Sequence, residues 1–292
     1  MEVSILIVSK NRKADLLQTL SILEDNIDKS EHEIRVFLDG CTDGSENLKN
    51  VFSWVHWEGV TKSIGASRAR SILYKKAKGN IFIGFDDDAH PLHSDFIDRI
   101  KQVFKSHKNV GVIAFKEVRG IFKSDQEALN TVTTAQKYLC SEFVGCGFAI
   151  KKEVYQATNG FPVWVDIYGE EACVSIEVIN NGFDILFTTD IVVNHRIDKN
   201  MREKQGNNYF RFRKQLKNST FYYLVYYKNP LLKIGKLYYH NFKKYGLKNA
   251  KYFYLFFKTL GICIFKTLWV LQFKNPIPMT VIKAKNKLNL PS

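Results

Sequence analysis

The chain has 292 residues, 45% of them hydrophobic, and a formal net charge of +14. This length suits one large domain or one domain with an extension, and the apolar content excludes a globally disordered protein. The five cysteines form no Cys-x-x-Cys pair and are odd in number, which argues against a disulfide framework and a structural zinc site and fits a reducing cytosol.

The first 120 residues alternate between strand-like and helix-like segments. The apolar run Val3–Val8 is short and follows an acidic second residue, so it is expected to be a buried strand and not a secretory signal. Strands that alternate with helices predict a mostly parallel sheet with helices on both faces. The other expected strands are Ile34–Leu38, Ile81–Phe85 and Val110–Phe115, and the expected helices are Asn11–Asn26, Ile64–Ala77 and Phe96–Phe104. In the second helix, the candidates for the buried side are Ile64, Ser67, Ile72 and Leu73.

Polar segments directly follow three of these strands, at Ser9–Arg12, Asp39–Gly44 and Asp86–Asp88. The carboxyl ends of neighbouring parallel strands meet at one edge of a sheet, and ligands of such proteins bind there. The three segments are therefore expected to form one ligand site.

The consecutive aspartates Asp86, Asp87 and Asp88 are the sharpest of these signals. Adjacent carboxylates repel one another and are most easily tolerated where a divalent cation neutralises them. Their hard oxygen ligands suit Mg²⁺ or Mn²⁺. The alternative is an acidic turn that caps the following helix. The position directly after a buried strand favours the metal site.

Three further segments carry weaker signals. Gly65–Arg70 contains two arginines that suit phosphate recognition, although a surface arginine more often lies on a solvated helix face. Phe143–Ile150 contains two glycines that permit close backbone approach to a ligand, or that form a tight turn before a strand. Tyr168–Glu171 ends in two carboxylates at a helix start, where the helix dipole favours them and where one can serve as a general base.

In this order, the segments resemble the family-2 inverting glycosyltransferases, which have the GT-A fold. The residues that carry the resemblance read SKNR, LDGCTDGS, GASRAR, DDD, GCGFAIKK, NGFP and YGEE, followed by a late histidine. The resemblance covers roughly residues 3–196, and its specificity lies in the order and spacing of the motifs. It implies an α/β GT-A nucleotide-sugar-binding domain at residues 1–198, with a mostly parallel sheet sandwiched by helices.

The resemblance also implies roles for individual residues. Asp86 and Asp88 match the acids of the DxD motif, which bind the ribose and the metal on the donor diphosphate, and His195 matches a histidine that can approach that metal. Glu171 matches the catalytic base, with Glu170 as the adjacent candidate. The implied donor-binding residues are Ser9, Arg12, Asp39, Arg70, Asp86 and Asp87, and the implied acceptor-side residues are Gly145 and Gly147.

The sequence departs from the family pattern at three positions. Leu38 replaces the first of two usual aspartates at the base, Ser71 replaces the usual asparagine after Arg70, and Glu170-Glu171 replaces the commoner Glu-Asp. The implied reaction is a single displacement in which the leaving nucleoside diphosphate is neutralised by Arg70 and by Mn²⁺ or Mg²⁺, while Glu171 deprotonates the acceptor hydroxyl. UDP- and dTDP-sugars are the favoured donors.

A basic, aromatic-rich region follows residue 198. Residues 1–198 carry 23 basic and 28 acidic residues, whereas residues 199–292 carry 20 basic residues and one acidic residue, Glu203. A segment with so asymmetric a charge is typical of proteins that bind an anionic surface. The nearly apolar run Tyr252–Phe273 predicts a helix. Its spacing places four lysines on one stripe of a helix, namely Lys244, Lys251, Lys258 and Lys266.

A lysine-lined helix that carries Phe and Trp on its other faces suits the interface of an anionic bilayer. The alternative is a helix that packs on the catalytic domain with its lysines in water. Two lysines within a span of ~20 residues argue against a transmembrane helix. Residues 199–292 are therefore expected to form a helical, membrane-associating region that holds a cytoplasmic protein on the inner face of the cell membrane.

The expected protein is thus a metal-dependent glycosyltransferase that acts on a glycan or lipid-linked acceptor at a membrane surface. One alternative is a non-catalytic protein with a glycosyltransferase-like domain, against which Asp86, Asp88 and Glu171 argue. Another is a nucleic-acid-binding protein, because basic residues interleaved with aromatic residues are its usual mark. The confinement of the lysines to one stripe of an apolar segment argues against a nucleic-acid partner.

Overall fold

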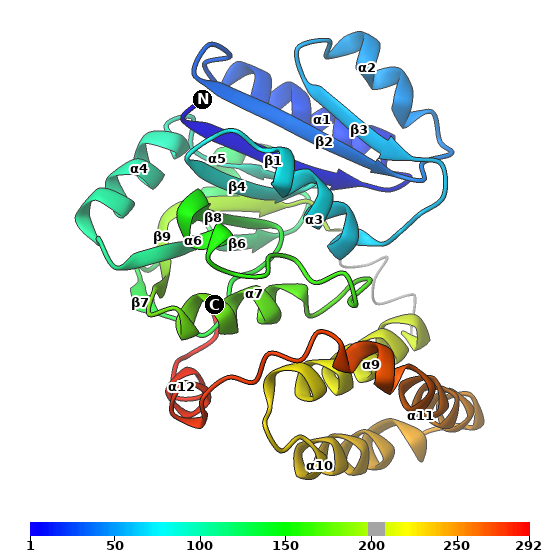
Figure 1. The fold of residues 1–292 in the computed structure, drawn as a ribbon. Helices are drawn as coiled ribbons and strands as arrows, with labels where there is room; N and C mark the ends of the chain where they lie inside the picture. Colours follow the sequence, from blue (N-terminus) through cyan, green and yellow to red (C-terminus); the bar gives the residue numbers. More distant parts are fainter. Residues whose placement is uncertain (198–207) are drawn as a thin grey trace.

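The computed structural model describes residues 1–197 and 208–292, so the expected boundary between residues 198 and 199 lies outside the described residues. Within the described part, nine strands form one sheet in the order β3-β2-β1-β4-β8-β6-β9-β5, with β7 paired to β9 (Figure 1). The strands are β1 Val3–Ser9, β2 His32–Asp39, β3 His56–Val60, β4 Ile81–Asp86, β5 Ala89–Pro91, β6 Val110–Arg119, β7 Lys137–Leu139, β8 Gly147–Lys151 and β9 Asp184–His195.

The strands that position the site are parallel. β1 pairs in parallel with β2 on one side and with β4 on the other, and Val8 lies opposite both Phe37 and Asp86. The three strands therefore end at the same level, as their polar following segments predict. Beyond β4 the sheet is mixed, because β8 runs antiparallel between β4 and β6 before β6 and β9 pair in parallel again.

Helices cover both faces of the sheet, which confirms the predicted α/β architecture. Side chains alternate along β1, so that Ile5 and Ile7 pack beneath one layer of helices and Leu6 beneath the other. The first layer contains α1 Lys13–Asp25, α2 Leu48–Val51 and α4 Phe96–Ser106, and the second contains α3 Ala66–Lys76, α6 Lys152–Gln156 and α7 Glu170–Asn180. The short α5 Asp125–Leu129 lies beside β9.

Helix α3 differs from its sequence-based prediction in two ways. It begins at Ala66 and not at Ile64, because Gly65 precedes the helix with a φ of +94°, a backbone conformation outside the helical range that glycine adopts readily. The predicted buried residue Ile72 is 38% exposed, whereas Arg70 is only 8% exposed. The helix is rotated so that Ala69 and Leu73 pack on the sheet and Arg70 faces the carboxyl ends of the strands.

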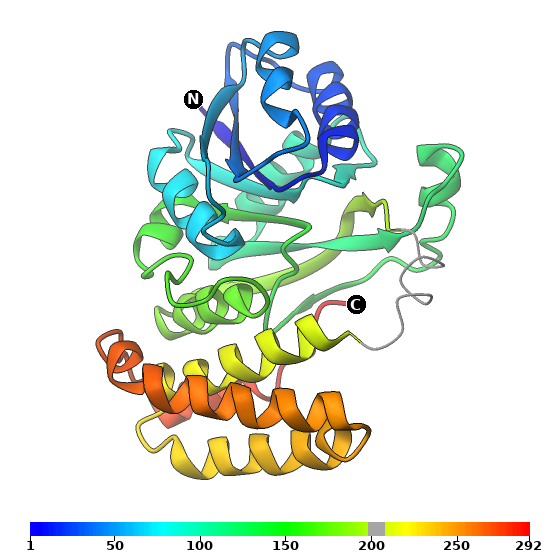
Figure 2. The ribbon, with the colours of Figure 1, turned by 90° about the vertical axis from the view of Figure 1, so that its right-hand side faces the viewer.

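The C-terminal region forms a separate helical layer against α7 (Figure 2). Its helices are α9 Tyr209–Tyr226, α10 Leu231–Asn241, α11 Ala250–Leu271 and α12 Met279–Lys285. One small core joins α9 to α11, and a second joins both helices to the sheet domain through residues such as Trp164 and Ile176. The chain then returns to the sheet domain, where Asn289 bridges to Cys140.

Helix α11 confirms the helix predicted at Tyr252–Phe273. Among the described residues it is the one helix long and apolar enough to cross a membrane, and 28% of the apolar window is buried. The predicted lysine stripe is wrong for Lys244, which lies in a π-helical turn before α11, because Asn249 caps α11 by accepting a hydrogen bond from the Tyr252 amide. Lys251, Lys258 and Lys266 lie on α11, and Lys266 lines the cleft described below.

Candidate active site

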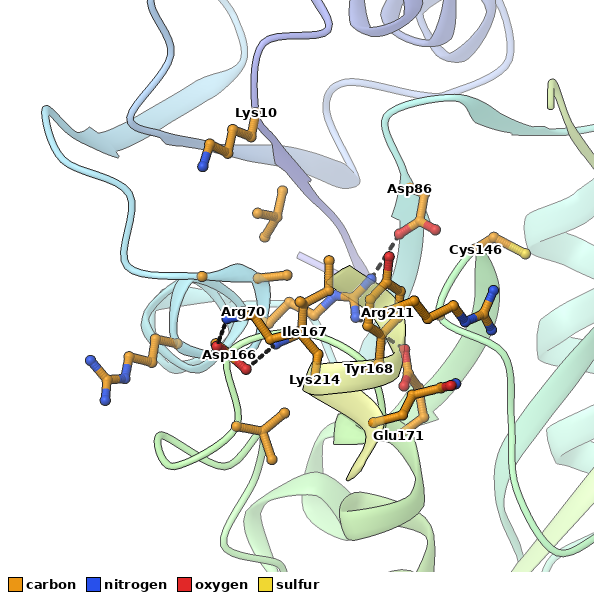
Figure 3. Close-up of a pocket in the computed structure, with 18 of the residues that line it drawn as sticks. Lys10, Arg70, Asp86, Cys146, Asp166, Ile167, Tyr168, Glu171, Arg211 and Lys214 are labelled. Carbon is orange, nitrogen blue, oxygen red and sulfur yellow. Dashed lines mark hydrogen bonds and ion pairs between the residues drawn. The ribbon is translucent and has the colours of Figure 1, made fainter. Parts of the chain in front are cut away.

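A cleft of about 1160 Å³ opens at the carboxyl ends of β1, β2 and β4 (Figure 3). One part of its lining comes from the loops after these strands, and another comes from the loop before α7. The helical region closes the remaining side with residues of α9 and α11. The cleft is thus built jointly by the sheet domain and by the C-terminal region.

Asp86, Asp88 and His195 form a candidate metal site, since one ligand atom from each lies within 4.8 Å of the others. The His195 ring places Nε2 3.2 Å from Asp88 and Nδ1 2.5 Å from Glu117. A carboxylate that holds one ring nitrogen of a histidine aims the other nitrogen at a metal, and Glu117 occupies that position here. Two carboxylates and an oriented imidazole suit Mn²⁺, and with added water ligands they also suit Mg²⁺.

A second possible ligand set combines Glu117, Cys146 and His195. Burial raises the pKa of the Cys146 thiol well above its ordinary value. Mn²⁺ and Mg²⁺ also prefer oxygen ligands to a sulfur ligand. Asp86, Asp88 and His195 are therefore the better donor set.

Asp87, the middle residue of the triplet, is held differently from its neighbours. Its side chain is 8% exposed and lies 3.5 Å from Arg12, and burial raises its pKa to about 7. Its carbonyl oxygen accepts a hydrogen bond from the Thr19 hydroxyl at 2.7 Å. Arg12 also pairs with Asp88 at 2.8 Å. Asp87 thus anchors the triplet to α1 through its carbonyl oxygen, and all three aspartates line the cleft.

Arg196 is a second residue that anchors the aspartate triplet to α1, and the sequence did not predict this role. Its guanidinium donates to the Thr19 hydroxyl at 2.6 Å and to the Asp15 carbonyl oxygen at 3.0 Å, and it contacts His90 Nδ1 at 2.5 Å. Its amide donates to the Asp88 carbonyl oxygen at 2.9 Å. Arg196 therefore holds the end of β9, next to His195, against both α1 and the aspartate triplet.

Asp39 organises the loop that leads into α3. Its carboxylate accepts hydrogen bonds from the Ser63 hydroxyl and the Ile64 amide, each at 2.7 Å, and from the Gly65 amide at 3.0 Å. Asp39 lines the cleft, whereas Ser9, which was expected beside it, is 1% exposed and lies behind the lining. The neighbours of Ser9, Val8 and Lys10, reach the cleft in its place.

Arg70 is the electrostatic centre of the cleft. Its guanidinium lies 2.8 Å from Asp86 and 3.1 Å from both Glu170 and Glu171. Burial opposes its charge, but these three carboxylates outweigh burial and raise its pKa further, so Arg70 stays charged. A buried cation that joins the metal-site carboxylates to two further carboxylates can hold a diphosphate and a base in one geometry.

The two glutamates differ in their access to the cleft. Both begin α7, after Tyr168 and Gly169 adopt left-handed backbone conformations with φ of +71° and +99°. The Glu170 side chain is 3% exposed, whereas the Glu171 side chain is 20% exposed and lines the cleft. Burial raises the pKa of Glu171, and burial with the charge of Glu171 raises that of Glu170 to about 8. Glu171 is the carboxylate that a substrate can reach.

The two glycines expected on the acceptor side have different positions. Gly145 lines the cleft, and a Cβ atom there would lie 2.3 Å from Glu171 Oε1 and 3.0 Å from Arg70 Nη2. Gly147 lies in β8, where a Cβ atom would meet Val193 at 2.8 Å. Gly147 therefore serves the packing of the sheet and does not contribute to the cleft lining.

Gly145→Ala is expected to lower activity by about 10²-fold, because a displacement of about 1 Å in a catalytic group costs roughly that factor. The added methyl group must push Glu171 or Arg70 aside, while the fold is kept. Turnover and melting temperature should be measured together, with Gly261→Ala as the control, since a Cβ atom there meets nothing within 4 Å. Full activity in a folded Gly145→Ala protein would contradict the assigned position of Glu171.

The metal-free protein is expected to lose stability as the pH rises from about 6 to 9. Burial raises the pKa of Glu170 from 4.5 to about 8 and that of Asp87 from 3.8 to about 7. Burial lowers the pKa of His195, but hydrogen bonds to Asp88 and Glu117 outweigh it and raise the pKa from 6.5 to about 9. Each of these groups binds its proton more tightly in the folded state, so its contribution is lost as the pH rises through its folded value.

Thermal denaturation in EDTA across this range measures the effect. The melting temperature should fall with rising pH, and Glu170→Gln should make the fall shallower near pH 8. A melting temperature that rises between pH 6 and 9 would show that these three groups do not take up protons on folding.

Residues of the helical region complete the cleft, which the sequence did not predict. Asn218 of α9 donates hydrogen bonds to the carbonyl oxygens of Ile167 at 2.7 Å and Tyr168 at 2.9 Å, which fixes α9 against the loop before the two glutamates. Asp166 in this loop pairs with lysines of α9. The residues that α9 and α11 contribute to the lining are Phe210, Arg211, Lys214, Gln215, Lys217, Phe221, Lys266 and Trp269.

Comparisons with known proteins bear on the fold. No family model matches the chain. A curated protein of Haemophilus influenzae, itself uncharacterized, is 24% identical over 182 residues, which are 55% of this chain and 92% of that protein.

Three solved glycosyltransferase structures resemble the chain. A structure of GalNAc-T7 with UDP, GalNAc and Mn²⁺ has a TM-score of 0.57 at 18% identity, over 67% of this chain. S. aureus TarS 1–349 in complex with UDP-GlcNAc has a TM-score of 0.62 at 15% identity, over 96% of this chain and 83% of that one. A Pyrobaculum calidifontis mannosyltransferase with GDP-Man and Mn²⁺ has a TM-score of 0.56 at 14% identity, over 98% of this chain and 75% of that one.

This chain spans 43% of the GalNAc-T7 chain and 37% of the longer TarS chain. At such identities the likeness concerns the fold. The predicted α/β fold of the GT-A type, with a helical C-terminal extension, is confirmed.

Proposed function

We propose that this protein is a metal-dependent, inverting glycosyltransferase of the family-2 type, which moves a sugar from a nucleoside diphosphate to a glycan or lipid-linked acceptor at a membrane surface. The observation that carries the proposal is the single cleft in which Arg70 contacts both Asp86, of the candidate metal set, and Glu171, the candidate base. The solved structures with UDP, UDP-GlcNAc and GDP-Man support a nucleotide sugar as the donor.

The donor would bind with its diphosphate toward the aspartates. Asp86, Asp88 and His195 would hold Mn²⁺ or Mg²⁺, which when bound would neutralise charge on the leaving diphosphate. Arg70 adds a buried positive charge at the same place and keeps it fixed through its carboxylate partners. UDP- and dTDP-sugars remain the favoured donors, with Asp39 holding the loop beside the nucleotide.

Glu171 would act as the general base. Its raised pKa keeps the carboxylate a better proton acceptor than an ordinary glutamate, and its place at the cleft lets it reach an acceptor hydroxyl. The acceptor oxygen then attacks the anomeric carbon as the bond to the diphosphate breaks, and its proton passes to Glu171. One displacement inverts the configuration at that carbon.

The activity is tested with single UDP-, dTDP- and GDP-sugars, each with Mn²⁺ or Mg²⁺ and with membrane and glycan extracts as acceptors. Nucleoside diphosphate release that needs a divalent ion and depends on one donor is the expected result, and NMR of the product should show inversion at the anomeric carbon. Folded protein that releases no nucleoside diphosphate from any donor would contradict the proposal.

The membrane proposal is supported by the outer face of the helical region. Residues 208–292 contain 17 basic residues and no acidic ones. Lys251 and Lys258 are exposed beside an apolar face of α11, an arrangement that suits an anionic bilayer surface. On this basis the protein would lie on the cytoplasmic face of the cell membrane. The exposed apolar residues of α10 and α11 include Leu231, Leu232, Phe253, Phe257, Ile264, Phe265 and Leu268.

Replacing both Phe265 and Leu268 with serine is expected to weaken binding to anionic phospholipid vesicles by about tenfold or more, since these side chains are 88% and 81% exposed and would enter the interface. Co-sedimentation measures the change, and Ile121→Ser, on the sheet domain at 72% exposure, is the control. Unchanged vesicle binding in the double variant would contradict the membrane proposal. Salt-sensitive binding to oligonucleotides without vesicle binding would favour a nucleic-acid partner instead.

A further inference from the structure

The chain that follows α12 holds one end of a loop that borders the cleft. It returns from the helical region to the sheet domain, as the red trace in Figure 1 shows. The Asn289 carbonyl oxygen accepts hydrogen bonds from the Ser141 amide at 2.8 Å and from the Ser141 hydroxyl at 3.2 Å. The Leu290 carbonyl oxygen accepts another from the Tyr138 hydroxyl at 3.0 Å. These contacts fix the start of residues 140–146, here called the rim loop.

Lys285, the last residue of α12, holds the rim loop from a second direction. Its ammonium group lies 2.7 Å from Glu142 Oε1, and its side chain is only 8% exposed. One turn earlier on α12, Ile282 packs in a core shared with Ile176 of α7, which fixes the helix that carries Lys285. An apolar pair of similar size would stabilise the fold as well as a buried ion pair or better, so packing alone does not require these two charges.

Glu142 reaches the cleft, whereas Lys285 stays behind the lining. The Glu142 side chain is 31% exposed, and it is the one charged side chain that the rim loop contributes to the lining. A carboxylate has about four sites at which it can accept a hydrogen bond, and Lys285 uses Oε1. Glu142 can therefore accept further hydrogen bonds from a molecule in the cleft. The rim-loop residues in the lining are Glu142, Phe143, Val144, Gly145 and Cys146.

The rim loop runs past the candidate base to the end of β4. Its far end leads into β8, where Gly147 lies opposite Phe85 near the end of β4. Between the two ends, Gly145 lies so close to Glu171 that a Cβ atom would be 2.3 Å from Oε1. Along the loop, the order is therefore Glu142, then the segment beside Glu171, and then the end of β4 with its aspartates.

The charge of Glu142 also acts on Glu171. Burial raises the pKa of Glu171, and the negative charges of Asp86 and Glu142 raise it further, although Arg70 acts in the opposite direction. Glu142 and Glu171 line the same cleft. Two carboxylates that lie close together in one cleft can contact a single sugar through different hydroxyl groups.

We propose that Glu142 binds a hydroxyl group of the acceptor sugar and that Lys285 positions Glu142 from α12. The inference rests on the proposed glycosyl transfer and adds a residue that determines which acceptor is used. An ionised carboxylate accepts hydrogen bonds and donates none, so it suits a hydroxyl beside the one that Glu171 deprotonates. It also disfavours a sugar with an acidic group at that place, because like charges repel.

Glu142→Gln and Lys285→Gln test the pair. Transfer is measured with a saturating nucleotide sugar and increasing amounts of the membrane or glycan extract that serves as acceptor in the transfer assay. Each variant should need about tenfold more extract for half-maximal transfer, because a hydrogen bond to a charged group is weakened or misplaced. Lys285→Arg keeps the charge and should restore most of this loss. Binding of nucleoside diphosphate with Mn²⁺ should match the wild type in all three variants.

The control variants are Glu153→Gln and Lys283→Gln, which make the same chemical changes at exposed positions outside the cleft lining. Their transfer curves should match that of the wild type, and melting temperatures show whether each variant is folded. Glu142→Gln carries the test alone if Lys285→Gln does not fold.

An unchanged requirement for extract in folded Glu142→Gln would overturn the proposal. Loss of nucleoside diphosphate binding in that variant would do the same, because it would assign Glu142 to the donor. A Lys285→Arg protein that behaves like Lys285→Gln would remove the positioning role of Lys285. A wild type that transfers no sugar would instead contradict the proposed function, and the inference would fall with it.

Discussion

Replacing Glu171 with glutamine is expected to lower the rate of sugar transfer by about 10²–10⁴-fold, the range that a positioned general base contributes. Glutamine keeps the size of the side chain and a hydrogen-bonding oxygen, but it cannot take the acceptor proton. Binding of nucleotide with Mn²⁺ should persist, because Glu171 contacts Arg70 and does not belong to the metal set. Turnover with a saturating donor measures the loss.

Glu170→Gln separates the two glutamates. Glu170 is 2% exposed, and one of its carboxylate oxygens has no hydrogen-bond partner among the described residues, so its main contact is Arg70. Its replacement should alter the pH profile and lower activity far less than the loss of Glu171. A larger loss in Glu170→Gln than in Glu171→Gln would reverse the assignment of the base.

Asp88→Asn should reduce metal-dependent donor cleavage by about 10²–10³-fold, comparable to the loss of a preorganised group that stabilises transition-state charge. Asp88 contacts His195 at 3.2 Å and Arg12 at 2.8 Å, and its side chain is 2% exposed. The change removes one charged ligand and one anchor of His195 together. When nucleoside diphosphate release is measured against Mn²⁺ concentration, the variant should need more Mn²⁺ for half-maximal release and should reach a lower maximum.

The matched control for this variant is Asp95→Asn. The Asp95 side chain is 54% exposed and pairs with Arg99 on the surface of α4, so the same chemical change there should leave cleavage unaltered. Equal losses in the two variants, or full activity in folded Asp88→Asn, would remove Asp88 from the metal site.

The parallel half of the sheet could be predicted because its strands are short apolar runs bounded by polar segments. β1, β2 and β4 are buried along nearly their whole lengths, so hydrophobicity alone marks them. β3 was not predicted, because this edge strand is half-exposed and contains Gly59, so it forms no apolar run. The antiparallel insertion of β8 between β4 and β6 depends on pairing between distant segments, which local patterns do not encode.

The candidate site was predictable only in part for a similar reason. Asp86, Asp88 and Glu171 belong to motifs whose order and spacing carry the family resemblance. Glu117 and Arg196 act by holding other residues, and neither lies in such a motif. Arg70 reads locally as a solvated helical arginine, and only the rotation of α3 and the approach of α7 bury it among three carboxylates.

The composition of the helical region did not indicate that part of this region lines the cleft. Its excess of basic and aromatic residues predicts an anionic surface as the partner, and the outer face of α11 fits that prediction. The inner face of α9 places Arg211, Lys214 and Lys217 in the cleft, a position that depends on Asn218 and Asp166 and not on any periodicity. One basic region therefore supplies both an exposed outer face and part of the cleft lining.

Calorimetric titration of the metal-free protein with UDP, dTDP and GDP, each with and without Mn²⁺, tests the central claim most directly, because it needs no acceptor. We expect saturable binding of at least one nucleoside diphosphate, which requires Mn²⁺ and is lost in Asp88→Asn. Folded wild-type protein that binds none of them in the presence of Mn²⁺ would contradict the assignment of this cleft to a nucleotide sugar.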